Sequence, residues 1–218
     1  MKSLPYVVPF GAVIALLAVR PLLPLAPLAE QILWILVLGA TFLLVARPAL
    51  DLRVRNWPAS ILLGIAVFAL WVGPDLVFPG YHSYKLFSNA VTGSIAAVLP
   101  ESSRGDVAVL TLRTVRAALF IPIAEELFWR GWLMRWIISH DFAKVPLGTW
   151  SLRSFWIVAV LFASEHGPLW DVGLAAGILY NWWMLRTKRL GDVMLAHGVT
   201  NACLSAYVVF GGRWEYWA

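Results

Sequence analysis

The chain of 218 residues has little charge and almost no cysteine. Asp, Glu, Lys and Arg make up 13% of it and hydrophobic residues 61%. Soluble domains average about 25% charged and about 45–50% apolar residues. The single cysteine, Cys203, has no partner for an intrachain disulfide or for a thiolate metal site. These shortages exclude an ordinary soluble domain, a disulfide scaffold and a cysteine-ligated metal centre.

The sequence also lacks tandem repeats, low-complexity tracts and a glycine-rich phosphate loop. Its net charge is +5, which membrane topology explains more simply than a nucleic-acid partner does. Cytoplasmic loops of membrane proteins collect Lys and Arg. Two such clusters follow apolar runs, and we predict that both lie in the cytoplasm. They consist of Arg47, Arg53 and Arg55, and of Arg186, Lys188 and Arg189.

Apolar runs recur along the whole chain. They fall at about 6–26, 30–46, 57–79, 107–124, 126–139, 154–166, 168–185 and 191–210. A membrane-crossing helix needs about 20 apolar residues, so the runs predict about seven or eight transmembrane helices. We therefore expect an all-α, polytopic membrane bundle, with residues 1–218 in a single membrane domain. Pro122 is expected to kink or break the stretch that contains it.

The first polar motif lies inside an apolar run, where each charged group costs about 2.5–3.5 kcal/mol to insert. In IPIAEELFWRGW, Glu125 and Glu126 are adjacent, and Arg130 follows Glu126 at the spacing of an i,i+4 ion pair. Glu125 lies about 100° round the helix from Glu126. One carboxylate can therefore pair with the arginine while the other faces a cavity as an acid or base.

Two further motifs follow on successive apolar runs. In LFASEHGPLW, Phe162 and His166 are four residues apart. In MLAHGVTNACL, His197 and Asn201 are four apart and share a helical face. The order E-E-x-x-x-R, F-x-x-x-H, H-x-x-x-N is specific. It defines a predicted catalytic core over residues 107–205.

We expect the other polar residues of interest to have structural roles outside the predicted site. We expect His82 and His140 to be solvated in polar connections, and Glu165 to be a local hydrogen-bond or charge partner. Arg113 and Arg116 are expected to snorkel from a helix end. Binding of lipid headgroups or of a substrate C-terminus is the alternative for these two arginines.

At the three motifs the sequence resembles the CPBP family, the CAAX prenyl endopeptidases and their bacteriocin-processing and self-immunity relatives, also called Abi proteins. The resemblance covers about residues 107–205. The length and Trp-rich, polytopic character also look like the CAAX protease-related proteins that accompany bacterial exosortase sorting systems. The resemblance implies an intramembrane endopeptidase that acts on a membrane-associated protein or peptide. It further implies a plasma-membrane location and a cavity open to the cytoplasm.

The resemblance also implies roles for individual residues. Glu125 and His166 would activate the attacking water, and His197 and Asn201 would hold the oxyanion of the tetrahedral intermediate. This division suits peptide hydrolysis without an activated Ser or Cys, which needs a base for water and donors for the oxyanion. Supporting roles fall to Glu126, Arg130 and Phe162.

Metal dependence and two other functions stay open. The chain has no H-E-x-x-H motif, and a metal-free mechanism without a cofactor is favoured. The alternative is a zinc site with Glu125, His166 and His197 as its three protein ligands. A non-enzymatic scaffold or immunity factor would keep the motifs as a structural polar network. A transporter would use Glu125, Glu126 and His166 as a proton relay.

Overall fold

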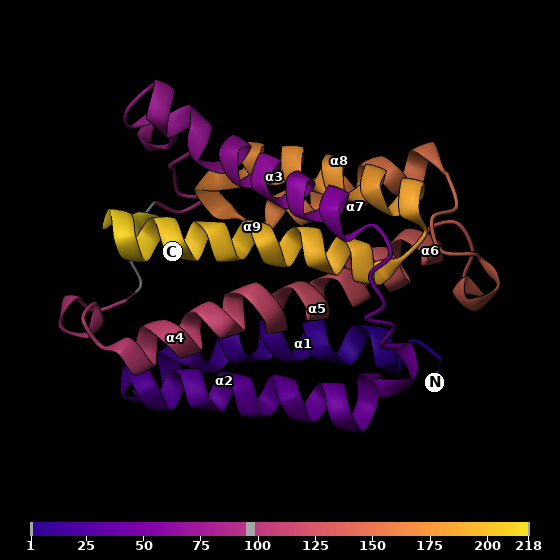
Figure 1. Ribbon diagram of the computed structural model, residues 1–218, viewed down its shortest axis with the longest axis horizontal. Helices are drawn as coiled ribbons and strands as arrows, with labels where there is room; N and C mark the ends of the chain where they lie inside the picture. Colours follow the sequence, from indigo (N-terminus) through magenta and orange to yellow (C-terminus); the bar gives the residue numbers. More distant parts are fainter. Residues whose placement is uncertain (1, 95–98, 218) are drawn as a thin grey trace.

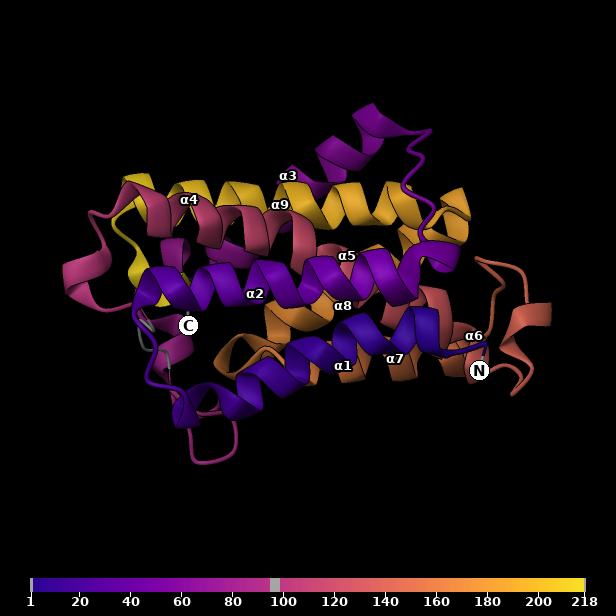
Figure 2. The same ribbon diagram turned by 90° about the horizontal axis from the view of Figure 1, so that it is seen from below.

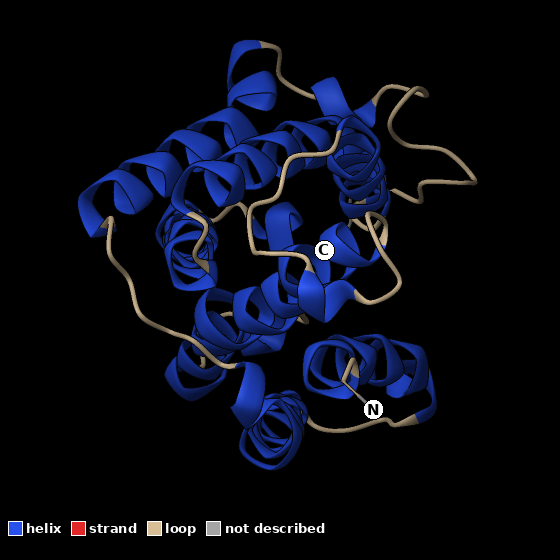
Figure 3. Ribbon diagram, turned by 90° about the vertical axis from the view of Figure 1, so that its right-hand side faces the viewer, coloured by secondary structure: helices blue, strands red, loops and turns tan. Residues whose placement is uncertain are grey.

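The computed structural model describes residues 2–94 and 99–217, and their regular structure is helical (Figure 1). The end-on view in Figure 3 shows helices and loops without strands across this described part. The predicted all-α class is confirmed. The α-helices are α1 (Leu4–Val19), α2 (Pro27–Thr41), α3 (Trp57–Val77), α4 (Val107–Val115), α5 (Ile121–Glu126), α6 (Met134–Trp136), α7 (Leu152–Ser164), α8 (Trp170–Thr187) and α9 (Leu190–Gly211).

Within residues 2–94 and 99–217, five helical stretches are long and apolar enough to cross a membrane. They are Leu4–Leu22, Pro27–Ala49, Trp57–Val77, Val107–Trp136 and Leu190–Gly211. Helix α7 is apolar but only 13 residues long. The structure therefore supports an integral membrane bundle, and the count of seven or eight crossings stays a prediction.

The stretch around Pro122 differs from the expectation. The two apolar runs expected at 107–124 and 126–139 form one helical stretch, Val107–Trp136, which Pro122 does not break. A π-helical segment, Arg116–Phe120, immediately precedes α5, whose second residue is the proline, and a second one, Leu127–Leu133, follows α5. Proline removes a backbone donor, and a wider turn can absorb the loss without ending the helix.

Helix α9 occupies a central position in the bundle. It packs against α3 on one side and against the Val107–Trp136 stretch on another, while α1 and α2 lie beyond that stretch (Figures 1 and 2). A Cβ on Gly64 of α3 would come within 2.4 Å of the Ala196 carbonyl oxygen of α9. Small residues permit such close approach, and in lipid this packing is a main source of helix association.

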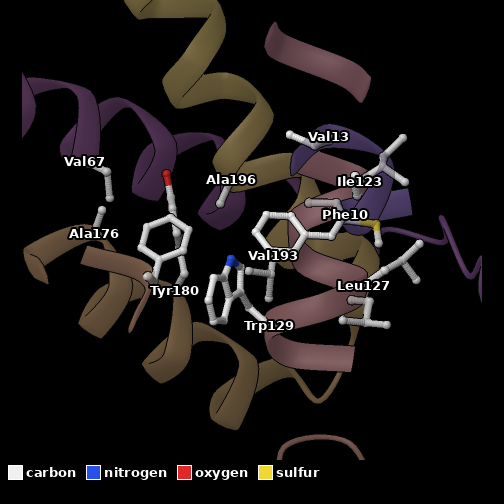
Figure 4. Packing of buried hydrophobic residues seen from close by; sticks show 14 of the residues in the cluster. Phe10, Val13, Val67, Ile123, Leu127, Trp129, Ala176, Tyr180, Val193 and Ala196 are labelled. Carbon is white, nitrogen blue, oxygen red and sulfur yellow. The ribbon is translucent and has the colours of Figure 1, made fainter. Parts of the chain in front are cut away.

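A cluster of buried apolar side chains packs around the polar motifs. Phe10 from α1, Leu127 from the Val107–Trp136 stretch and Val193 from α9 belong to one buried cluster (Figure 4). Tyr180 of α8 and Trp129 of the Val107–Trp136 stretch belong to the same cluster. The side chains of the site are therefore held by packed neighbours from several helices.

Two polar contacts tie connections to the bundle. The buried Asp192 carboxylate at the start of α9 accepts hydrogen bonds from the backbone N–H groups of Arg55 and Asn56 at 2.8 and 2.9 Å. It also accepts one from the Asn56 amide at 2.9 Å. These bonds fix the segment before α3 against α9.

The second contact corrects the prediction for His82. This side chain is fully buried between Asp75 of α3, which contacts Nδ1, and Asp171 of α8, whose Oδ1 lies 2.9 Å from Nε2. The prediction was wrong because Asp75 lies on the preceding helix and Asp171 is 89 residues away, so no local pattern shows that both meet His82. His140 is exposed, as predicted, and stacks on Trp136.

Candidate active site

The three motifs meet around one cavity of about 470 Å³. Helix α5 carries the two glutamates, the turn after α7 carries His166, and α9 carries His197 and Asn201. The side chains that line the cavity include Glu125, Phe162, His166, His197 and Asn201. Glu126 and Arg130 are fully buried behind its wall. The structure therefore brings together every residue that the sequence analysis selected for the site.

The Glu126–Arg130 pair forms the buried support of the site. Arg130 Nη1 donates to Glu126 Oε1 at 2.9 Å, which confirms the ion pair predicted from the i,i+4 spacing. Arg130 Nε donates to Asn181 Oδ1 at 2.9 Å, and Nη2 donates to the Gly177 carbonyl at 3.2 Å. Burying a charged pair is costly unless its hydrogen bonds are made, and here the guanidinium binds three acceptors. The pair therefore links α5 firmly to α8.

Glu126 also orients His197. Its Oε1 lies 3.0 Å from His197 Nδ1, and a carboxylate at this position is an acceptor for an Nδ1–H donor. The other ring nitrogen, Nε2, lies 4.0 Å from Glu125 Oε2. The ring is held from one side by Glu126 and directed toward Glu125 on the other.

Of the two adjacent glutamates, Glu125 is the one that lines the cavity. Its Oε2 is buried and has no hydrogen-bond partner among the described residues. The 4.0 Å separation from His197 Nε2 exceeds ordinary hydrogen-bond length. Because Glu125 also lines the cavity, its carboxylate is the one beside which a molecule that enters the cavity would bind.

His166 presents one ring nitrogen as an acceptor. Its Nδ1 lies 2.7 Å from the Phe162 carbonyl, which can only accept, so Nδ1 carries the hydrogen. In the neutral ring Nε2 is then unprotonated. A Cβ on Gly173 would come within 3.1 Å of His166 Nδ1, so glycine makes room for the ring. His166 lies outside the five candidate spans, and desolvation lowers its pKa to about 4 despite the bond to Phe162.

Asn201 is held by the π-helical segment. Its Nδ2 donates to the Ala117 carbonyl at 2.9 Å. An amide nitrogen carries two hydrogens, so one N–H is left to donate into the cavity. Phe162 supports the site through contacts with two motif residues: the Arg130 guanidinium lies 4.6 Å from the centre of its ring, and the His166 ring centre lies 4.8 Å away.

Sequence reasoning missed two residues of α8. The Tyr180 ring stacks on His197 with centres 5.0 Å apart, and its hydroxyl donates to Thr200 Oγ1 at 2.7 Å. Asn181 is fully buried, accepts from Arg130 and donates to the Phe155 carbonyl at 2.8 Å. An asparagine inside an apolar run is the one signal that could have found it.

Glu165 is a local hydrogen-bond partner, as predicted. Trp129 Nε1 donates to Glu165 Oε1 at 3.1 Å, and the side chain borders the cavity. It also lies outside the five candidate spans. Desolvation raises the pKa of Glu165 to about 8, against the opposing effect of the Trp129 hydrogen bond. A protonated Glu165 adds no negative charge beside His166 at neutral pH.

Arg113 and Arg116 line the cavity, and the prediction that they snorkel from a helix end was wrong. Arg113 is 6% exposed and donates to the Trp217 carbonyl at 2.9 Å. The Arg116 guanidinium lies 4.5 Å from the centre of the Trp34 ring. Both arginines lie inside the helical stretch that begins at Val107. Their side chains pack against neighbouring segments, at Trp217 and Trp34, and do not extend from a helix end.

The described residues contain no preformed set of ligands for the zinc alternative. Within residues 2–94 and 99–217, no three His, Cys, Asp or Glu side chains are placed to hold a metal ion together. Glu125, His166 and His197 line the cavity without forming such a set. His197 Nδ1 is bound to Glu126, which leaves Nε2 as its free ring nitrogen. Metal dependence stays a prediction.

A helical bundle with five apolar candidate spans, and a cavity that several ionisable side chains line, supports an integral membrane protein. Residues 106–203 match the model of a family described as type II CAAX prenyl endopeptidase Rce1-like. The match contains all three motifs and supports the predicted assignment to the CPBP/CAAX protease family. No curated protein and no solved structure matches the chain. The exosortase-associated subgroup stays a prediction.

Proposed function

We propose that the protein is an intramembrane endopeptidase that hydrolyses a peptide bond of a membrane-associated protein or peptide. The observation that carries this proposal is the unpartnered Glu125 carboxylate, which faces a cavity shared with His166, His197 and Asn201. A CAAX protease-type hydrolase is also what the family match indicates. Residues 107–205 would form the catalytic core within a single membrane domain, 1–218.

Water activation is assigned to Glu125 and His166. Glu125 accepts a proton from a water molecule in the cavity, and the unprotonated Nε2 of His166 is a second acceptor for the same water. The water oxygen then bonds to the substrate carbonyl carbon. When the peptide C–N bond breaks, the proton taken from water passes to the leaving amine.

Stabilisation of the oxyanion is assigned to His197 and Asn201. They lie one helical turn apart on α9, and Asn201 keeps one N–H for the cavity. His197 Nδ1 is bound to Glu126, so Nε2 is the ring nitrogen that would donate to the oxyanion when both nitrogens carry a hydrogen. Donors directed at the developing charge in a site that excludes water contribute strongly to such reactions.

The site would lie within a plasma membrane. Helices α7 and α8 pack together, and α8 also packs along α9 and α3 (Figure 1). We propose that both cross with the five longer stretches, which gives seven crossings. Substrate and lipid bilayer are then the partners of the protein, without nucleic acid or metal cofactor.

A scaffold or immunity factor is the second candidate. The hydrogen-bonded Glu126–Arg130–Asn181 network favours a structural role for those three residues. A scaffold would give no reason for the unpartnered carboxylate of Glu125. Substitution of Glu125 therefore separates the two functions.

The test compares purified wild-type protein with Glu125→Gln, His166→Ala and the control Glu101→Gln, which changes an exposed glutamate in a connection. Each protein is incubated with a library of membrane-anchored peptides, with and without a chelator, and products are identified by mass spectrometry. Wild type and control should cleave, and loss of the base should lower the rate by about 10²–10⁴-fold. Absence of cleavage by wild type would favour the scaffold. Chelator-sensitive cleavage that zinc restores would refute the metal-free mechanism.

A further inference from the structure

The cavity extends from the site toward one end of the bundle. Beyond Glu125 and His197 its lining reaches Arg20 after α1, Pro168 between α7 and α8, and Trp217 after α9. These residues lie at what we call the cavity end, which holds the connections 23–26, 78–94, 99–106, 165–169 and 212–217 (Figures 1 and 2). The cavity thus leads from the glutamates to this end.

The opposite end contributes nothing to the cavity lining within the described residues. It holds residues 2–3 and the connections 50–56, 137–151 and 188–189, and we call it the basic end. The alternation of helix directions along the chain places these segments together, as Figures 1 and 2 show. The two ends therefore differ in their access to the site.

The two ends also differ in Lys and Arg. Ten of the 17 lie at or beside the basic end: Lys2, Arg47, Arg53, Arg55, Arg135, Lys144, Arg153, Arg186, Lys188 and Arg189. Four lie at the cavity end: Arg20, Lys85, Arg104 and Arg213. The others are the buried or cavity-lining Arg113, Arg116 and Arg130. Because an excess of Lys and Arg near the ends of spans marks the cytoplasmic side, the basic end belongs in the cytoplasm.

We propose that the cavity opens on the non-cytoplasmic side of the membrane. The substrate would then be a membrane-anchored peptide whose scissile segment has been translocated to that side. This orientation reverses the cytoplasmic opening implied by the family resemblance, and it keeps both arginine-rich loops in the cytoplasm. The identity of the substrate class rests on the proposed peptidase function, whereas the orientation rests on the charge distribution alone.

Orientation is tested by labelling two exposed lysine positions in a Cys203→Ser background. Lys85→Cys reports on the cavity end and Lys144→Cys on the basic end, and neither residue lines the cavity. Spheroplasts are treated with a membrane-impermeant maleimide before and after permeabilisation. We expect Lys85→Cys to be labelled in intact spheroplasts and Lys144→Cys only after permeabilisation. The reverse pattern, or equal labelling of both in intact spheroplasts, would overturn the proposal.

A second measurement tests the side from which substrate enters. Membrane-anchored peptides that cannot cross the bilayer are added to right-side-out and inside-out vesicles that contain the full chain. Cleavage is expected in right-side-out vesicles, and cleavage confined to inside-out vesicles would refute the outward opening. If neither vesicle type cleaves while the labelling pattern holds, the peptidase function fails and the orientation stands.

Discussion

The buried pair of Glu126 and Arg130 permits a quantitative test of how the site is held. The perturbation is Arg130→Met, which keeps a long apolar side chain and removes the guanidinium. Glu126 would then lose its cationic partner inside the bundle, and its Oε2 already has no hydrogen-bond partner among the described residues. Asn181 would lose a donor, although its bond to the Phe155 carbonyl remains.

The expected magnitude follows from the charge left behind. Removing one member of a buried ion pair costs about 3–5 kcal/mol, because the other charge stays buried without its partner. Glu126→Gln should cost a similar amount, since Arg130 then lacks its carboxylate. The double variant Glu126→Gln/Arg130→Met carries neither charge, so its loss should fall short of the sum of the single losses by about 0.5–3 kcal/mol.

The assay is equilibrium unfolding in mixed micelles, followed by the fluorescence of the 13 tryptophans. Lys144→Met is the matched control, because it breaks an ion pair with Asp141 whose side chains are 83% and 43% exposed. The control should unfold like wild type. The reasoning would be refuted if Arg130→Met stayed within about 1 kcal/mol of wild type, or if the single losses added in the double variant.

Three further predictions concern other parts of the chain. Asp192→Ala should destabilise the protein by about 3 kcal/mol in the same unfolding assay, because three hydrogen bonds to a charged group are lost, and exposed Asp51→Ala should match wild type. Gly198→Ala should lower the melting temperature and the rate of peptide cleavage, since its Cβ would come within 2.6 Å of a carbonyl oxygen, while Gly11→Ala has open space and should change neither. Because desolvation lowers the pKa of His166 to about 4, the unfolded chain binds more protons as pH falls from about 6.5 to about 4, and stability should decline over that range. Unfolding measured across this pH range should show a smaller decline for His166→Gln, and an unchanged decline would contradict the cause given.

The parts of the site that sequence reasoning could predict are those fixed by local geometry. The Glu126–Arg130 pair follows from helical spacing alone, and the structure contains it at 2.9 Å. The helical class and the membrane location follow from apolar content, which is a property of the whole chain. The three motifs could be selected because polar groups are rare in apolar runs.

The remaining contacts depend on how distant segments meet. His82 is buried because Asp75 and Asp171 converge on it, and residue 171 is 89 positions away. Tyr180 reaches His197 only because α8 packs on α9. Pro122 was expected to kink or break the stretch, yet the helix is continuous through it after a π-helical segment, and the residues around the proline do not by themselves distinguish those outcomes.

The π-helical segment before α5 holds one residue more than a regular α-helix would need there. A π turn contains one more residue than an α turn, so deleting the exposed Leu119 would allow a regular α-helix to form. The α turn that forms covers about the same rotation as the π turn that is lost, so Glu126 would still face His197. The same deletion from a regular α-helix would turn every later side chain by about 100°. The segment is therefore a place where the helix tolerates a change of one residue in length without moving the glutamates away from the histidines.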